Sequence, residues 1–127
     1  MQMGSLGGIA GSALNAFGVD MLVRANNIAN VNTNGFHAQD LSLMTGPGGY
    51  GVMVGAVTTS TNPGPYVPGF ISISDNGGIV PGYVEGSNTD IANEFVHMIS
   101  TQHAYAANAV TIRTADEMLG SLLDVKV

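Results

Sequence analysis

The sequence predicts a mainly α-helical fold with a small β insert, in which long N- and C-terminal helices pair as a coiled-coil-like hairpin. All five prolines and eleven of the eighteen glycines lie between residues 46 and 86, which excludes long helices there. Both flanking segments repeat apolar residues near the helical period. We therefore expect three zones: a first helix within residues 1–40, a Gly/Pro-rich insert at 41–87 and a second helix within 88–127.

The first helix is expected over residues 5–33. Its apolar positions near a 3.6-residue spacing are Leu6, Ile9, Ala10, Ala13, Phe17, Met21, Ile28 and Val31. Four glycines interrupt it at positions 7, 8, 11 and 18, and each costs about 1 kcal/mol relative to alanine. Tertiary or quaternary contacts must therefore supply the stability of this helix, and we expect it to order only against a partner. Asn34 and Gly35 both tolerate a left-handed backbone and predict its end.

The insert is expected to hold two or three short strands. Residues 51–61 are rich in β-branched side chains, and residues 70–74 alternate in hydrophobicity, with turn-forming dipeptides around both. The long uncharged stretch 41–74 is broken by glycine, proline, serine and asparagine, so we predict no membrane insertion from it. The N-terminal residues lack a positively charged region and a compact apolar region, so no cleaved secretory signal is expected.

The second helix carries the strongest periodic signal. Asn88 is the predicted N-cap, and Asp90 in the first turn favours the helix dipole. A strict 4-3 step then visits Ile91, Phe95, Met98, Gln102, Tyr105, Ala109, Ile112, Asp116, Leu119 and Leu123. This step is typical of a coiled-coil seam. A second apolar line, Ala92, Val96, Ile99, Ala106 and Val110, indicates that the helix faces more than one neighbour.

Charge is scarce and acidic. Three Lys and Arg residues stand against nine Asp and Glu residues, a net charge of −6, and only 9% of the chain is charged. An ordinary soluble domain has roughly 25%, so other molecules are expected to cover much of the surface. Three basic residues cannot form a basic footprint, which excludes nucleic acid as a partner. The chain has no cysteine and hence no disulfide framework.

No pattern of catalytic residues is present. Glu94 and His97 have the Glu-x-x-His spacing of di-iron bundles, but such a site also needs carboxylates on facing helices, and the first helix offers only Asp20. His97 and His103 fall on opposed sides of a helix. We therefore predict no enzyme activity, no metal and no cofactor.

An asparagine cluster ends the first helix at Asn26, Asn27, Asn30, Asn32 and Asn34. One reading is a fraying helix end followed by a turn, because asparagine competes with the helix backbone for hydrogen bonds. The other is hydrogen bonding between helices of neighbouring subunits. The glycines at 4, 8 and 11, with Ser12 and Ala16, likewise mark either a loose terminus or a close approach of helix backbones.

Four motifs resemble one known family. Residues 25–36, ANNIANVNTNGF, resemble the N-terminal signature of the bacterial flagellar rod and hook proteins, the axial proteins of the flagellum. Residues 82–88, GYVEGSN, are similar to the entry into that family's C-terminal helix, and 98–108 and 114–119 resemble its body. Thr89, His37 and His103 depart from the family's usual residues. The length leaves room for a small insert only, which is similar to the short proximal rod proteins.

The resemblance implies a structural subunit of the basal-body rod that assembles by helix packing into a torque-transmitting helical tube. Expected partners are other copies, other rod proteins, the flagellar type III export apparatus and surrounding ring proteins, with the rod spanning the periplasm. The alternative is a flagellar or secretion-associated adaptor that keeps the helical core and does not polymerise. The expected assembly interface comprises Asn26, Asn27, Ile28, Asn30, Asn32, Gly35, Phe36, Ile91, Phe95, Met98, Ile99, Tyr105, Asn108, Ile112, Leu119 and Leu123.

Overall fold

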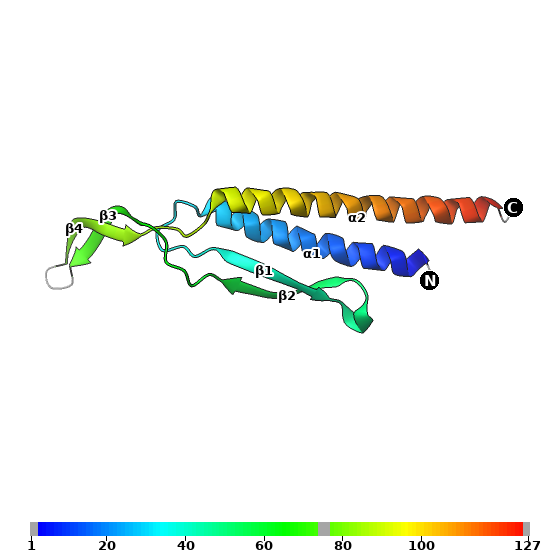
Figure 1. Ribbon diagram of the computed structural model, residues 1–127, viewed down its shortest axis with the longest axis horizontal. Helices are drawn as coiled ribbons and strands as arrows, with labels where there is room; N and C mark the ends of the chain where they lie inside the picture. Colours follow the sequence, from blue (N-terminus) through cyan, green and yellow to red (C-terminus); the bar gives the residue numbers. More distant parts are fainter. Residues whose placement is uncertain (1–2, 74–76, 126–127) are drawn as a thin grey trace.

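The computed structural model describes residues 3–73 and 77–125, which form two long helices and two β-hairpins (Figure 1). In chain order the elements are α1 (Met3–Ala29), β1 (Gln39–Thr45), the 3-10 turn η1 (Pro47–Gly49), β2 (Val52–Thr59), β3 (Tyr66–Ile73), β4 (Gly78–Glu85) and α2 (Ile91–Val125). The predicted arrangement of terminal helices around a small β insert is confirmed.

The molecule is elongated, and α1 is its middle layer. The antiparallel helix α2 lies along one side of α1, and the β1–β2 hairpin lies along another (Figure 1). The β3–β4 hairpin projects beyond the helices, at the end opposite the chain termini (Figure 1). Each hairpin is a separate antiparallel two-stranded sheet. The exposed surface of 8501 Å² exceeds the roughly 6,300 Å² of a compact domain of this mass, as an extended shape requires.

The insert holds four strands, one more than the largest number predicted. The expected strand at 51–61 corresponds to β2, and the one at 70–74 overlaps the second half of β3. The sequence reading missed β1 because QDLSLMT has little β-branched character, and missed β4 because it contains Gly82 and Pro81. Pairing with the neighbouring strand of each hairpin thus overrides the weak local preference of β1 and β4.

The ends of the two helices differ from the prediction. Helix α1 ends at Ala29, and the backbone continues in turns in which the Thr33 N–H donates to the Asn30 carbonyl. Gly35 has the predicted left-handed backbone, with φ of 76°. The predicted N-cap Asn88 is wrong: the Asp90 carboxylate accepts the N–H groups of Ala92 and Asn93 at 3.1 and 3.4 Å, so Asp90 caps α2.

The core between these elements is thin. Its buried apolar residues are Ala10, Ala13, Ala16, Val23 and Ala115. The largest fully buried side chain is polar, that of Asn27. Small side chains remove little apolar area from water when they are buried. Hydrogen bonds and an ion cluster therefore carry much of the specificity of the fold.

Helix α1 is also strongly apolar. Over Leu6–Ala29 it is long and apolar enough, by length and composition alone, to cross a bilayer. In this structure the same helix contacts α2 and both strands of the β1–β2 hairpin. Both core helices of soluble proteins and membrane spans meet such a criterion, so the property does not decide between them.

Candidate assembly interface

The seam between α1 and α2 is lined by small and polar side chains. On α2 the residues Glu94, Thr101 and Ala115 are buried, and Asn108 is partly buried between them. These four positions follow one another at seven-residue steps, which is the period that keeps one line of a helix against its partner. On α1 the buried residues include three alanines and Asp20. Apart from Val23, the apolar residues that the described parts of the two helices bury are alanines.

The predicted apolar seam lies mostly elsewhere on α2. Met98 and Ile112 are partly buried, whereas Ile91, Phe95, Tyr105, Leu119 and Leu123 are exposed. The line next to the predicted one turns toward α1 because Glu94 and Thr101 find polar partners there. A coiled-coil pairing of the two helices along the predicted seam is therefore not established. Five of the large apolar residues of this line are thus left exposed at the surface of the single chain.

A buried hydrogen bond ties the middle of the two helices together. The hydroxyl of Thr101 donates to the Asp20 carboxylate at 2.6 Å, and both residues are buried. A hydrogen bond to an ionised acceptor contributes more than a neutral one. This contact fixes the register of α2 against α1.

One arginine links three elements. The Arg24 guanidinium, nearly buried, hydrogen bonds to Asp40 on β1 and lies 3.5 Å from the Glu94 carboxylate on α2. Its Nε lies 3.4 Å from the Asp20 carboxylate but makes no hydrogen bond. Burial alone would lower the pKa of Arg24, but the bond to Asp40 and the three nearby carboxylates raise it above its ordinary value. Arg24 therefore stays charged and holds α1, β1 and α2 together.

The pKa of Asp40 is shifted by its contact with Arg24. Partial burial alone would raise the pKa of its carboxyl group, but the hydrogen bonds from Arg24 and from the Leu41 N–H outweigh burial and lower it. The side chain of Asp40 is 70% exposed, so water screens this interaction substantially. The carboxylate nevertheless anchors the start of β1 to α1.

The two family-like motifs at the ends of the chain meet at one junction. Asn27 exchanges two hydrogen bonds with the backbone of Gln39, and the Asn88 N–H donates to the Phe36 carbonyl at 3.2 Å. The Asn88 side chain accepts the Ala38 N–H at 2.6 Å and donates to the Asn62 carbonyl at 2.8 Å. Asn88, which lies between β4 and α2, thus hydrogen bonds to the segment between α1 and β1 and to the segment between β2 and β3.

His37 and Glu85 complete this junction. Their side chains lie 3.1 Å apart, and the Glu85 carboxylate also accepts the Gly64 N–H at 3.0 Å. The backbone carbonyl of Glu85 accepts the Gly35 N–H at 2.8 Å. Gly64 cannot carry a side chain here, because a Cβ would collide with the Gly86 carbonyl. Sequence reasoning missed this role of His37 and Glu85, since the two residues are far apart in the chain.

The asparagines of the cluster at the end of α1 differ in how far they are buried. Asn27 is fully buried and bonded within the chain, whereas Asn26 and Asn32 are exposed. Asn30 is partly buried and donates back to Asn26, and Gly35 is exposed. Ile28 and Phe36 are partly buried. The expected bonding between subunits therefore stays a prediction for the exposed members, while Asn27 serves the fold of its own chain.

A group of exposed apolar residues lies on the side of α2 opposite Glu94 and Thr101. We call it the outer flank and define it as Phe95, Val96, Ile99 and Val110, whose side chains are between 49% and 65% exposed. Single exposed apolar residues are ordinary on a protein surface, but several on one side of a helix are typical of a contact with another molecule. The expected line of Ala92, Val96, Ile99, Ala106 and Val110 is thus open to a neighbour, all five residues being exposed.

The described residues hold no group of three or more His, Asp or Glu side chains arranged to bind a metal. Glu94, half of the Glu-x-x-His pair, instead faces Arg24, and His97 and His103 are exposed. The histidines and carboxylates of this part of the chain therefore form ion pairs, caps and surface rather than a ligand set.

Comparison with known proteins identifies both ends of the chain. Residues 9–37 match the family model described as flagella basal body rod protein. Residues 80–125 match the model described as flagellar basal body rod FlgEFG protein C-terminal. The two matched segments are those that form α1 with its junction and β4 with α2. The motifs noted in the sequence fall within them.

Individual relatives agree with these models. The chain is 44% identical over 63 residues to the flagellar basal-body rod protein FlgG of Buchnera aphidicola subsp. Schizaphis graminum, covering 50% of this chain and 23% of that protein. It is 44% identical over 50 residues to the flagellar hook protein FlgE of Caulobacter vibrioides, covering 39% and 8%. It is 40% identical over 50 residues to FlgE of Salmonella typhimurium, covering 39% and 12%. The chain thus spans less than a quarter of the length of these relatives.

Proposed function

We propose that this chain is an axial subunit of the basal-body rod, because both of its ends match models of flagellar basal-body rod proteins and its individual relatives are flagellar rod and hook proteins. In this role the helices of many copies pack side by side into a helical tube, and torque passes through the repeated contacts. Contacts that do not close on themselves generate such an open helical array.

The observation that carries the proposal is the outward-facing apolar surface of α2. The polar seam uses Glu94 and Thr101 to hold α1, which leaves Phe95, Val96 and Ile99 open to water in the single chain. Apolar area contributes about 25 cal/mol per Å² when a neighbour covers it. The outer flank therefore favours lateral packing of helices from different copies.

The same proposal accounts for the chain's shortage of charge. A subunit that is covered by neighbours needs few charged side chains for solubility, and only 9% of this chain is charged. Its partners are then other copies, other rod proteins and the ring proteins around the rod. Export through the flagellar type III apparatus would deliver it to a rod that spans the periplasm.

Replacement of one outer-flank residue tests the proposal. Ile99→Asp places a charge in the surface that neighbours would cover, and Ser100→Asp places the same charge at an adjacent exposed position outside the outer flank. An epitope-tagged chain is expressed in motile cells, and isolated basal bodies are probed for the tag. We expect the parent chain and Ser100→Asp in basal bodies, and Ile99→Asp and Phe95→Asp to be absent from them.

Each other outcome has a definite meaning. Normal incorporation of both outer-flank variants refutes lateral packing through α2. Absence of the parent chain from basal bodies, together with a soluble and cooperatively melting monomer, refutes the axial role and supports the non-polymerising adaptor. Circular dichroism of the purified variants verifies that the substitutions leave the helices formed.

A further inference from the structure

The turn that follows α1 holds a chemically reactive pair of residues, Asn34 and Gly35. When glycine follows asparagine, the glycine nitrogen can attack the side-chain amide, because glycine has no Cβ to hinder the approach. The sequence contains two such pairs, at 34–35 and at 76–77, and Asn76 lies outside the described residues. Asn34 is exposed, so water reaches its side chain.

The reaction needs water and no other reagent. The Gly35 nitrogen forms a bond to Cγ of Asn34, the bond from Cγ to the side-chain nitrogen breaks, and the proton of the Gly35 N–H leaves with that nitrogen as ammonia. Water then adds to either carbonyl of the resulting succinimide ring. Opening of the ring leaves aspartate, or isoaspartate, in which the main chain runs through the former side chain. No atom is oxidised or reduced in either step.

The backbone of the folded chain is set against this attack. The Phe36 N–H donates to the Thr33 carbonyl at 3.2 Å, which closes a β-turn with Asn34 and Gly35 in its middle. Gly35 has φ of 76°, whereas no described residue other than glycine has a positive φ, and this combination is that of a type II turn. In such a turn ψ of the first central residue is about +120°, which points the Gly35 nitrogen away from the Asn34 side chain.

A hydrogen bond holds the same nitrogen in place. The Gly35 N–H donates to the backbone carbonyl of Glu85, the last residue of β4, at 2.8 Å. The nitrogen must give up this proton and rotate with its peptide plane before it can attack Asn34. Both changes break the bond to Glu85, so the cost of breaking it adds to the barrier of the reaction.

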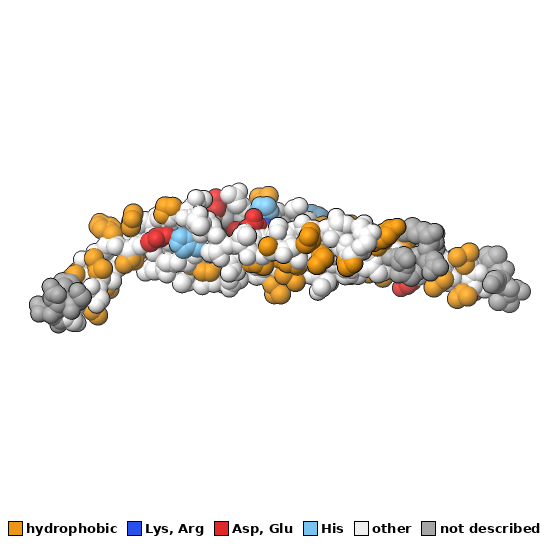
Figure 2. Space-filling view, turned by 90° about the horizontal axis from the view of Figure 1, so that it is seen from below, with side chains coloured by type: hydrophobic (Ala, Val, Ile, Leu, Met, Phe, Trp, Pro, Cys, Tyr) orange, Lys and Arg blue, Asp and Glu red, His pale blue; other side chains and the backbone are white. Residues whose placement is uncertain are grey.

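The junction fixes Glu85 in turn. The Glu85 carboxylate lies 3.1 Å from the His37 side chain and accepts the Gly64 N–H at 3.0 Å. Figure 2 shows acidic and histidine side chains together at the root of the projecting hairpin, where this contact lies. The Gly35 nitrogen is therefore released only when the contacts between the turn after α1 and the root of the β3–β4 hairpin open.

We propose that Asn34 is a site of spontaneous modification to aspartate or isoaspartate, and that the closed junction keeps its amide intact in the folded chain. The reaction is then confined to chains whose junction has opened, either by local opening of the fold or before folding is complete. The inference does not depend on the axial role, because it rests on contacts within one chain.

The isoaspartate product cannot restore the junction. It lengthens the main chain between Asn34 and Gly35, which breaks the turn and displaces the Gly35 N–H from the Glu85 carbonyl. The new carboxylate also adds a negative charge to a chain whose net charge is already −6. A modified chain therefore stays open at this point, and the modification marks chains in which the junction was open.

Peptide mapping by mass spectrometry tests the proposal. All chains carry Asn76→Gln, which removes the other Asn–Gly pair, and are incubated at mildly alkaline pH, either folded or in guanidinium chloride. We expect loss of the Asn34 amide to be at least about tenfold slower in the folded chain, equivalent to about 1.4 kcal/mol for opening the junction.

Two substitutions that weaken the junction should speed the reaction in the folded chain. Asn88→Ala removes the bonds to Ala38 and Asn62, and His37→Gln removes the ion pair with Glu85. Each should raise the rate at position 34 at least about threefold, as expected for the loss of a hydrogen bond. Circular dichroism verifies that both variants keep their helices.

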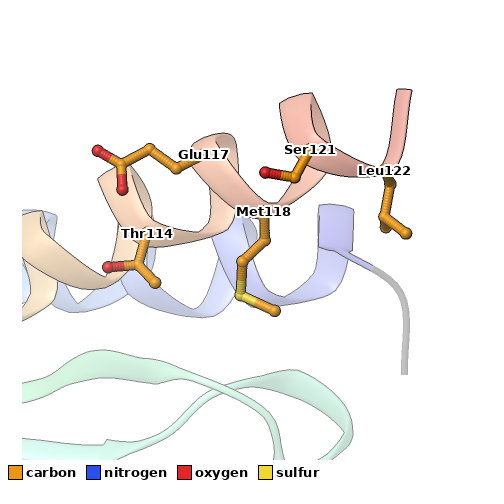
Figure 3. Close-up of a pocket in the computed structure, with 5 residues that line it drawn as sticks. All are labelled: Thr114, Glu117, Met118, Ser121 and Leu122. Atoms are coloured by element: carbon orange, nitrogen blue, oxygen red, sulfur yellow. The ribbon is translucent and has the colours of Figure 1, made fainter. Parts of the chain in front are cut away.

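An engineered second pair is the matched control. Leu119→Asn places an asparagine before Gly120, on the exposed stretch of α2 between Met118 and Ser121 (Figure 3). This stretch lies at the end of α2 away from the junction (Figure 1). The rate of amide loss at position 119 should be the same with and without Asn88→Ala.

Other results overturn the proposal. Equal rates at position 34 in the folded chain and in guanidinium chloride show that the junction gives no protection. Folded Asn88→Ala and His37→Gln chains with the parent rate show that these contacts do not hold the Gly35 nitrogen. Equal acceleration at positions 34 and 119 means a general loosening of the chain. Amide hydrogen exchange at Gly35 is an independent measurement and should be faster in the same two variants.

Discussion

Asn27 and Gln39 bond to each other in both directions: the Asn27 side chain donates to the Gln39 carbonyl at 2.7 Å and accepts the Gln39 N–H at 2.9 Å. The side-chain amide thereby pairs with the Gln39 backbone as a residue of a neighbouring strand would. It links the last turn of α1 to the first residue of β1. Asn27 is 0% exposed, so water cannot replace either bond. One buried side chain thus sets where the first hairpin begins.

Asn27→Ala should destabilise the chain by about 1–3 kcal/mol, because it leaves the N–H and carbonyl of Gln39 without partners. Asn26→Ala, which alters the adjacent exposed asparagine, should change stability by less than about 0.5 kcal/mol. Urea unfolding followed by circular dichroism measures both effects. Faster amide exchange at Gln39 in the Asn27 variant alone would locate the damage, and equal effects of the two substitutions would contradict the assignment.

Arg24→Met should lower stability by roughly 3 kcal/mol or more, since it leaves the carboxylates of Glu94 and Asp20 buried without their cation. Arg113→Met removes the same charge from an exposed position and should have little effect. Thermal unfolding of the two variants at one protein concentration gives the comparison. A similar small shift for both would mean that the cluster contributes nothing beyond net charge.

The chain should lose stability in acid partly through Asp40. The pKa of its carboxyl is lower in the folded than in the unfolded chain, so its contribution is present above the ordinary value of 3.8 and is lost as the pH falls through the folded value. Asp40→Asn should therefore melt at a lower temperature near neutral pH and show a shallower decline below about pH 4. Asp116→Asn, an exposed change on α2, should keep the parent slope.

Gly8→Ala and Gly18→Ala should stabilise the isolated chain by roughly 0.5–1 kcal/mol each, because alanine favours a helix interior. Apart from the neighbouring residues and the backbone of the same helix, no described atom lies within 4 Å of the Cβ that either change would add. If these glycines serve close approach of a neighbouring helix, incorporation into basal bodies falls while the melting temperature rises. A rise in both incorporation and melting temperature would indicate that the glycines only weaken the helix.

Sequence periodicity predicted the two helices but not the side of α2 that contacts α1. The apolar line through Phe95 and Leu119 is regular, but two polar contacts, Thr101 with Asp20 and Glu94 with Arg24, decide which side of α2 meets α1. A hydropathy pattern contains no information on such pairings, because each partner lies more than sixty residues away in the chain. Which apolar line faces another molecule is consequently a tertiary property.

Local sequence patterns did not predict the contacts of the junction between the two family-like motifs either. Asn88 looked like a helix cap by residue type, and its side chain instead binds Ala38 and Asn62. His37 stood out in the sequence only as a departure from the usual residues of the resembling family, yet its side chain lies 3.1 Å from that of Glu85. Residues that join distant segments carry no periodic signal of their own. The family-like motifs marked the two sides of this junction without revealing that they touch.

The polar seam between α1 and α2 has a mechanical consequence. Separating two helices that bury mainly alanines, Thr101 and Asp20 exposes little apolar surface, so the increase in heat capacity on unfolding should be small for a chain of this length. A single molecule held together by so little apolar area should unfold under a small mechanical load. In the assembly proposed above, neighbouring copies would supply the rigidity that the single chain lacks.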